Sequence, residues 1–449
     1  MKRKIFSQLT LGALLLSLAP CAIAAPKTWT GAGDGVNWSS AGNWSPSAPA
    51  TGDDVTIPVT AGNPTIQFTA GAGTVQINSL SLSQPLNVTG GVLQIATTLQ
   101  TSKNLTLAGG ALKGGTISAT GGATLTMPIN NGGTLDGVTL ASDFTVLRNA
   151  SLGVKNGLTL NNAKLIFSSD LSGYTQTAVF QGTQTLGGTG QVLFAGSSNI
   201  NNIYAQGNGT AGGAAVLTVG TNVTVHGTQG GSLQNWYSFD SVVNQGTISA
   251  DTAGQTITIA GPFTNQGPMS APAGGLSLTG AWSSNSTITA TSGGALNLGG
   301  GSNTWSNTGT IGATSSTVNL GGSFSVASLG TFNRTGGTVN LTGTLNNAAA
   351  TLALTAATGS WVITGGTIVG GSITTTGGAA LSVPVNNGGT LDGVTLGCDI
   401  TVARNATLYV KNGLTLNSGR LVMSSDLSGY TQSIIFQGTQ TLGGTGELL

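Results

Sequence analysis

The side chains most able to do acid-base chemistry form one small set that occurs twice. Three aspartates and one arginine recur 256 residues apart, as Asp136, Asp143, Arg148 and Asp170 and then as Asp392, Asp399, Arg404 and Asp426. Carboxylates that converge can act as acid and base on a glycosidic bond, or can hold calcium beside a basic residue. An acidic groove present in both copies is therefore one interpretation of the set.

Turn chemistry is the interpretation that we favour. Asp136 precedes Gly137, and Asp170 follows two serines. In such contexts an aspartate accepts hydrogen bonds from nearby backbone and shapes a turn. We therefore predict that the set contains no catalytic residue, that the chain binds no metal or cofactor, and that the protein is not an enzyme.

The other residues that could do chemistry are sparse. His226 is the only histidine, which excludes a two-histidine metal site, and Glu447 is the only glutamate. Asp53 and Asp54 are adjacent, but two carboxylates alone suit calcium poorly because it takes about six to eight oxygen ligands. A turn before a strand at residues 55–57 is the favoured alternative. The glycine-rich runs contain no phosphate-binding loop.

Composition limits the partners. Only 6% of the residues are charged, and the formal net charge is +1. Nucleic acids and anionic membranes are held by basic surfaces, so neither is an expected partner. Hydrophobic residues make up 39% of the chain, which is enough for a buried core despite its 74 glycines.

The elements that must position the ionisable set are short repeats, which are clearest from residue 244 to residue 341. Asparagines recur at nearly constant spacing, at Asn244, Asn265, Asn285 and Asn307. Pairs of apolar residues recur at a similar interval, as Ile257 and Ile259, Leu276 and Leu278, Leu296 and Leu298, Val318 and Leu320, and Val339 and Leu341. A period of about 20 residues is typical of a solenoid, whose coils bury apolar side chains only against neighbouring coils.

The coils must be β rather than α, because their apolar residues alternate with Thr, Asn or Ser at a period of two. Stacked parallel strands would place each inward Leu, Ile or Val above its equivalent in the next coil. Stacked asparagines can hydrogen-bond along the axis and tolerate the backbone of a corner. The predicted fold is all-β: a single-stranded, right-handed parallel β-helix with coils of about 20 residues.

Residues 1–24 have the features of a signal peptide. Lys2, Arg3 and Lys4 precede the apolar run 9–19, and residues 22–24 form an A-x-A cleavage site. Cys21 raises the alternative of a lipoprotein, which Pro20 disfavours. Export would leave one thiol, Cys398, and no internal disulfide. No later segment reaches 18 consecutive apolar residues, so we expect no membrane-spanning helix after the signal peptide.

Residues 25–58 differ from the repeats that follow. This segment carries Trp29, Trp38 and Trp44 in the text WTGAGDGVNWSSAGNWSPSAP. A first coil has no neighbour on one side, so we interpret the tryptophans as a cap over the open end of the solenoid. Exposed tryptophans that stack on sugars are the alternative.

This arrangement resembles the start of many exported bacterial β-helix proteins, and the mature chain is similar to autotransporter passengers and filamentous-haemagglutinin-like surface proteins. The resemblance implies a non-enzymatic, structural or adhesin-like protein that is secreted or displayed at the bacterial cell surface. Its partners would be outer-membrane secretion machinery and glycans or proteins of a host, cell surface or matrix. The NPNG-type motif of haemagglutinin-like proteins is incomplete here, since Asn63 and Pro64 are followed by Thr65.

Residues 59–449 form the predicted β-helix, and they contain a large duplication. Residues 109–193 resemble residues 365–449 at a constant offset of 256. We interpret the offset as a block of about thirteen coils copied whole, in a solenoid of about 21 coils and roughly 100 Å. The first copy continues beyond the point that matches Leu449, so we expect the sequence to be truncated at its C-terminus.

Two functions from different classes follow. A stalk or adhesive surface needs length, a dry repetitive core and a polar exterior of Thr, Ser and Asn. A carbohydrate-active β-helix enzyme, either a polysaccharide lyase or a hydrolase, needs a convergent cluster of acids or bases. Ice binding through Thr-x-Thr ladders is a weaker third possibility, because the column of Thr247 and Ser249 is broken by Pro268 and Gly312.

Overall fold

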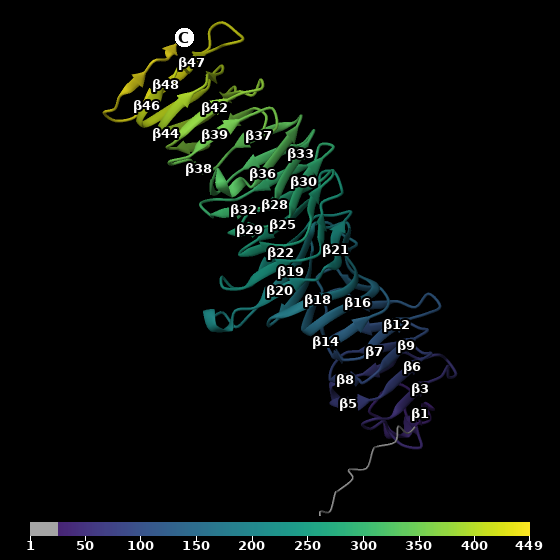
Figure 1. Cartoon of the computed structure of the whole chain (residues 1–449). Helices are drawn as coiled ribbons and strands as arrows, with labels where there is room; N and C mark the ends of the chain where they lie inside the picture. The colour runs from purple at the N-terminus through teal and green to yellow at the C-terminus, as the bar shows by residue number, and fades with distance from the viewer. Residues whose placement is uncertain (1–25) are drawn as a thin grey trace, which may run out of the picture.

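The computed structural model describes residues 26–449, so the predicted signal peptide lies outside the described residues. These residues wind into an elongated parallel β-solenoid of about 17 turns, with 55% of the chain in strands and almost no helix (Figure 1). The prediction of an all-β parallel solenoid is confirmed, whereas its right-handed sense stays a prediction.

Most coils contain three strands, and each strand pairs in parallel with the strand three places further along the chain. The coil therefore has three faces. Face 1 contains β5 (Thr74–Ile77), β8 (Val92–Ile95), β11 (Ala111–Lys113), β14 (Gly132–Leu140), β16 (Ser151–Ser169), β17 (Thr175–Gln181), β19 (Ile200–Gln206), β22 (Gly231–Asn235), β25 (Thr256–Ala260), β28 (Gly275–Leu278), β31 (Ala295–Leu298), β34 (Thr317–Leu320), β37 (Thr338–Leu341), β40 (Trp361–Ile363), β43 (Leu381–Val383), β45 (Ile400–Val402), β47 (Arg420–Met423) and β50 (Glu447–Leu448).

The other two faces use shorter columns, and the long strands β14 and β16 turn a corner and join more than one face. Face 2 contains β4 (Ile66–Phe68), β7 (Leu86–Val88), β10 (Leu105–Leu107), β13 (Leu125–Met127), β15 (Phe144–Leu147), β18 (Gln184–Gly196), β21 (Asn222–Gly227), β24 (Thr247–Ser249), β27 (Met269–Ala271), β30 (Thr287–Thr291), β33 (Thr310–Thr314) and β36 (Thr331–Thr335). Face 3 contains β1 (Pro26–Trp29), β3 (Asp54–Ile57), β6 (Ser79–Leu82), β9 (Thr98–Thr101), β12 (Thr116–Ala119), β20 (Val216–Val219), β23 (Ser241–Asn244), β26 (Phe263–Asn265), β29 (Trp282–Ser284) and β32 (Trp305–Asn307).

The remaining elements complete the two ends. A separate nine-stranded sheet contains β35 (Ser323–Ser325), β38 (Thr344–Asn346), β39 (Thr351–Leu354), β41 (Thr367–Val369), β42 (Ser372–Thr375), β44 (Gly388–Gly397), β46 (Thr407–Leu416), β48 (Ser433–Phe436) and β49 (Leu442–Gly444). Strand β2 (Trp44–Ser45) pairs antiparallel with β1. Short 3-10 helices are η1 (Ala41–Asn43), η2 (Ala70–Ala72), η3 (Ala211–Gly213) and η4 (Ala327–Leu329).

The core is the ladder of inward apolar residues that the repeats predict. Leu278 pairs with Ile259 in the preceding coil and with Leu298 in the next one. Leu298 pairs in turn with Leu320, and all these side chains are buried. The repeated apolar pairs therefore stack in register along face 1, as expected.

The asparagine column is confirmed except at one position. Asn244 Nδ2 donates to Asn265 Oδ1 at 2.8 Å, which is the predicted bond along the axis. The next residue in the column is Ser284, whose hydroxyl accepts from Asn265 Nδ2 at 3.1 Å. The placement of Asn285 was wrong, because alternation along β29 turns Ser284 inward and leaves Asn285 exposed.

The number of coils was also overestimated. The turns average roughly 22 residues rather than 20. Coils in the middle of the chain are lengthened by loops, since Leu165 pairs with Val192 and Val192 pairs with Val225, and both pairs are further apart in sequence than an average turn. About 17 turns at a strand spacing of about 4.8 Å give a rod of roughly 80 Å.

Candidate functional site

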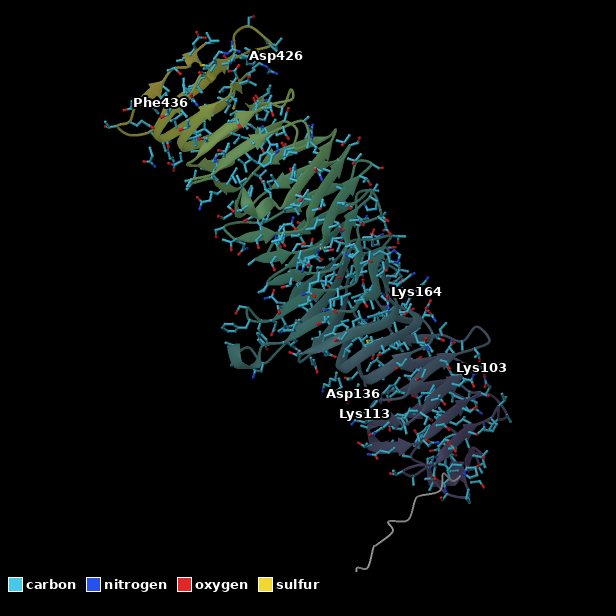
Figure 2. All side chains as sticks on the ribbon, in the orientation of Figure 1. Lys103, Lys113, Asp136, Lys164, Asp426 and Phe436 are labelled. Carbon is cyan, nitrogen blue, oxygen red and sulfur yellow. The ribbon has the colours of Figure 1, made fainter. Side chains whose placement is uncertain are left out.

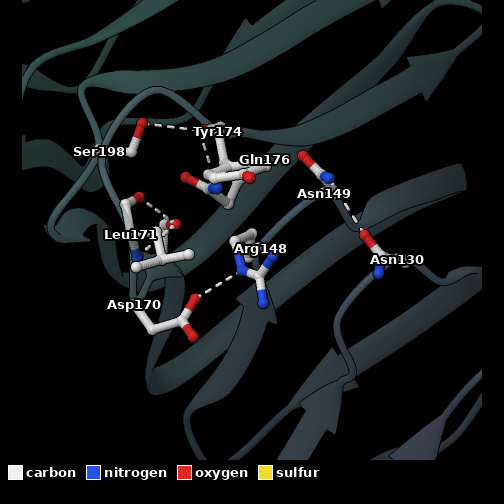
Figure 3. Close-up of polar contacts among 9 residues, drawn as sticks. Asn130, Arg148, Asn149, Asp170, Leu171, Tyr174, Gln176 and Ser198 are labelled. Atoms are coloured by element: carbon white, nitrogen blue, oxygen red, sulfur yellow. Dashed lines mark hydrogen bonds and ion pairs between the residues drawn. The ribbon is translucent and has the colours of Figure 1, made fainter.

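Arg148 and Asp170 lie together at a corner of the first copy (Figure 3). Arg148 Nε donates to Asp170 Oδ1 at 2.7 Å, and its guanidinium lies 5.0 Å from the centre of the Tyr174 ring. The aspartate side chain is 59% exposed, so the pair faces solvent. The Arg148 guanidinium is therefore held by the Asp170 carboxylate and the Tyr174 ring.

The loop that carries Asp170 and Tyr174 is held by its own hydrogen bonds (Figure 3). Ser169 Oγ donates to the Leu171 carbonyl at 2.6 Å. The Tyr174 carbonyl accepts from Ser198 Oγ at 2.6 Å and from Gln176 Nε2 at 3.0 Å. The local turn is therefore made by Ser169 and Gln176, whereas Asp170 accepts its hydrogen bond from the Arg148 side chain of the preceding coil. The Ser198 hydrogen bond ties this loop to the next coil.

The other two aspartates of the set do not join this corner. Asp136 accepts from Asn156 Nδ2 at 2.5 Å, whereas Asp143 accepts from the Lys164 backbone N–H at 2.9 Å. Figure 2 shows Asp136 and Lys164 on different sides of the rod. The set is therefore divided among separate corners, and it does not form the acidic groove considered above.

The second copy repeats these contacts almost unchanged. Arg404 Nε donates to Asp426 Oδ1 at 2.7 Å and lies 4.8 Å from the Tyr430 ring. Asn412 Nδ2 donates to Asp392 Oδ1 at 2.6 Å. Asp399 differs from its counterpart, because Arg420 binds it with both its backbone N–H and its guanidinium.

The electrostatics of the second copy favour charged, hydrogen-bonded carboxylates. The hydrogen bond from Arg404 lowers the pKa of Asp426 from its ordinary value. The hydrogen bond from Arg420 likewise lowers the pKa of Asp399. A general acid needs a carboxyl whose pKa is raised toward the working pH, and these two are shifted the opposite way.

The remaining candidates are also occupied by local contacts. His226 lies 3.1 Å from Asp251 and 3.3 Å from Gln191. Asp54 accepts from Asn78 and Ser79, each at 2.6 Å. Buried Asp53 instead accepts from the Ala50 backbone N–H at 2.8 Å. Within residues 26–449, no group of three or more His, Cys, Asp or Glu side chains is placed to hold a metal ion.

The N-terminal tryptophans pack against one another. Trp29, Trp38 and Trp44 are at most 5% exposed. The Trp44 ring contacts Trp29 at 4.9 Å and Trp38 at 4.8 Å, both edge to face. Stacking on a sugar needs an open ring face, which these buried rings lack; their role as a cap stays our interpretation.

A different aromatic cluster, which was not predicted from the sequence, lies in the middle of the rod. Trp236, Tyr237 and Phe239 are 45%, 40% and 52% exposed, in the loop after β22. The text NWYSFD could have marked this loop, because aromatic residues make up only 5% of the chain. Three aromatic side chains thus face solvent from one short segment.

The fold and these contacts define a parallel β-solenoid repeat protein. Comparison of the chain with protein families, curated proteins and solved structures finds no match. None of the helices formed by residues 26–449 is long and apolar enough to cross a membrane.

Proposed function

We propose that the chain is a non-enzymatic, structural or adhesin-like β-solenoid that is exported to the bacterial cell surface or secreted. The observation that carries this proposal is that the aspartates of the ionisable set form hydrogen bonds between coils. In both copies, Asp136, Asp170 and their counterparts Asp392 and Asp426 bind side chains of neighbouring coils. Their charges stabilise corners and are not gathered around a space for a substrate.

Several features support the surface role. The rod has a buried apolar ladder and a largely uncharged polar exterior. Its expected export depends on the signal peptide predicted for residues 1–24, and its expected display on the resemblance to autotransporter passengers and haemagglutinin-like proteins. Outer-membrane secretion machinery and host, cell-surface or matrix glycans or proteins are the partners that we propose.

The experiment tests the enzyme alternative with the mature chain from residue 25. We expect no release of reducing or unsaturated sugar ends from neutral or acidic polysaccharides, with or without calcium. The double variant Asp136→Asn with Asp392→Asn should change the free energy of unfolding by less than about 1 kcal/mol, as surface substitutions usually do.

The matched control is Asp170→Asn with Asp426→Asn, which removes the same charges from the other corner. Sugar release that disappears in the Asp136 and Asp392 variant, but persists in the control with the same circular dichroism spectrum, would show that the protein is an enzyme.

A further inference from the structure

Four aromatic side chains form what we name the aromatic corner: Tyr204 at the middle of β19, and Trp236, Tyr237 and Phe239 after β22. The rings of Tyr204 and Trp236 meet edge to face with centroids 4.9 Å apart. Tyr204 is half-buried, while the other three side chains are exposed. The corner thus presents aromatic surface to solvent. A loop projects from the rod near β20 (Figure 1).

The aromatic corner is held in place by buried Asp240. Its Oδ2 accepts from the Tyr237 backbone N–H at 2.9 Å, and its Oδ1 accepts from the Ala215 backbone N–H at 2.8 Å. Asn235 Nδ2 also donates to the Tyr237 carbonyl at 2.8 Å. One carboxylate therefore ties the aromatic loop to the segment after η3, so the rings are presented by an ordered backbone.

A polar ladder lies on the outward side of the same strands. Asn202 Oδ1 accepts from Ser232 Oγ at 2.7 Å and from Gln234 Nε2 at 3.3 Å. Strand pairing places Tyr204 directly beside Gln234. Amide and hydroxyl groups are both donors and acceptors, so the ladder can exchange hydrogen bonds with the hydroxyls of a ligand. None of its side chains is charged.

Three of the six exposed large hydrophobic residues between Val59 and Met423 belong to the aromatic corner. Between Val59 and Met423, the large hydrophobic residues that are exposed all lie from residue 171 to residue 239: Leu171, Tyr174, Ile200, Trp236, Tyr237 and Phe239. From residue 240 to residue 422, no large hydrophobic residue is exposed. Stacking one coil on the next does not require exposed aromatic side chains, because a coil corner can be built from Gly, Asn and Ser.

We propose that the aromatic corner and the ladder of Asn202, Ser232 and Gln234 bind a neutral glycan. Pyranose rings have an apolar face of C–H groups that packs on an aromatic ring, and a rim of hydroxyls that suits amides and hydroxyls. The acid of this corner, Asp240, is buried and hydrogen-bonded to the backbone. Nucleic acid is disfavoured because residues 165–333 contain neither Lys nor Arg to bind phosphate.

This inference rests on the proposed adhesin-like function and names its ligand class. The test is isothermal titration of the mature chain with four neutral hexasaccharides: cellohexaose, xylohexaose, mannohexaose and laminarihexaose. We expect binding of at least one of them, weakened about tenfold or more by Trp236→Ala, since loss of one aromatic contact of about 1.4 kcal/mol has that effect. The binding should be insensitive to salt.

The matched control is Tyr430→Ala, which removes a side chain that is 46% exposed and lies outside the aromatic corner. This variant should bind as the wild type does. No binding of any of the four hexasaccharides, or binding that Trp236→Ala leaves unchanged in a folded protein, overturns the inference. An increase in the number of reducing ends during the titration would show that the hexasaccharide is cleaved. It would contradict the non-enzymatic function while leaving the aromatic corner as a glycan-binding site.

Asp240→Asn provides a second readout. It keeps all four rings but removes the charge that accepts two backbone N–H groups, so it should weaken hexasaccharide binding while leaving the other coils folded. Unchanged affinity in this variant, with the Trp236→Ala loss intact, would overturn the role of Asp240 in placing the rings.

Discussion

The two copies of the duplicated block, residues 109–193 and 365–449, share most of their side-chain contacts, but their equivalent strands lie on different faces of the rod. Successive pairings along face 1 lead from β16 in the first copy to β45 in the second through eleven steps. The sequence counterpart of β45 is β15, which belongs to face 2. The second copy is therefore turned about the axis by one face.

This difference shows that a solenoid block need not be copied as a whole number of turns. Each of the three faces is a strand followed by a corner, and a residue contacts only its own coil and the adjacent ones. Rotation about the axis preserves those contacts, as the 2.7 Å ion pairs of Arg148 and Arg404 show. The two arginine corners point in different directions, so a flat ligand could not engage both.

Within residues 26–449, a following coil covers the first copy at Phe180 but not the second copy at Phe436. Phe180 is fully buried, because β19 pairs with β17 and stacks Ala205 beside it. Its counterpart Phe436 is 37% exposed and pairs only with Val410 of the preceding coil in the described chain. Burial in this fold thus depends on the neighbouring coil as much as on the residue itself.

The largest expected effect uses this contrast. Phe180→Ala should cost about 3 to 5 kcal/mol, the range for a large buried aromatic side chain. In a protein that consists of residues 25–449, Phe436→Ala should cost under about 1.5 kcal/mol, because less of its apolar area leaves water. Hydrogen exchange of the β17 and β48 amides, read beside denaturant unfolding, would measure each loss locally. Equal losses at the two sites would contradict the dependence of burial on the next coil.

Much of the fold could be predicted from the sequence. The apolar pairs such as Leu276 and Leu278 determine which side chains face inward, because a strict alternation within a regular repeat has one stacked solution. The predicted position of Asn285 in the asparagine column and the predicted number of coils were wrong for the same reason. Loop length changes between coils, and a local pattern does not show how many residues a corner contains.

The candidate site was less predictable. Asp136 and Asp170 are close in sequence, but face geometry assigns them to different corners. The aromatic corner depends on pairing Tyr204 with β22, which follows only after two intervening strands and the η3 loop, and no local pattern indicates that pairing. The duplication was visible at its constant offset of 256 residues, but its rotation depends on the total of all intervening loops.

The second prediction sharpens the comparison at one substituted position, where Ser142 of the first copy is matched by Cys398. Burial, together with the charge of Asp399, raises the pKa of the Cys398 thiol to about 11. Because the thiolate is the reactive form, labelling of native mature chain at pH 8 should be at least about tenfold slower than for Ser142→Cys in a Cys398→Ser background. Denatured chains should react equally; a native Cys398 that reacts at the denatured rate would contradict its burial.

The smallest expected effect concerns Asp399, which accepts a hydrogen bond from Arg420 Nε at 3.0 Å. In the first copy, the counterpart Asp143 accepts a hydrogen bond from the backbone N–H of Lys164. The pKa of Asp399 is lowered in the folded state, chiefly by that hydrogen bond. Its stabilising contribution is therefore complete above the unfolded pKa of about 3.9 and is lost as pH falls through the lower, folded pKa. The contribution is small, because both side chains are more than 40% exposed and solvent screens the pair.

Arg420→Lys makes the second copy resemble the first at this corner. We expect carboxyl NMR titration to show the pKa of Asp399 rising toward its ordinary value in this variant, since lysine cannot donate the paired guanidinium bonds. Thermal melting from pH 5 to pH 2 should then fall slightly less steeply than in the wild type. The control is Arg404→Lys, which removes the guanidinium from Asp426 and should leave the titration of Asp399 unchanged. An Asp399 titration that is the same in the Arg420→Lys variant as in the wild type would show that the ion pair does not cause the shift.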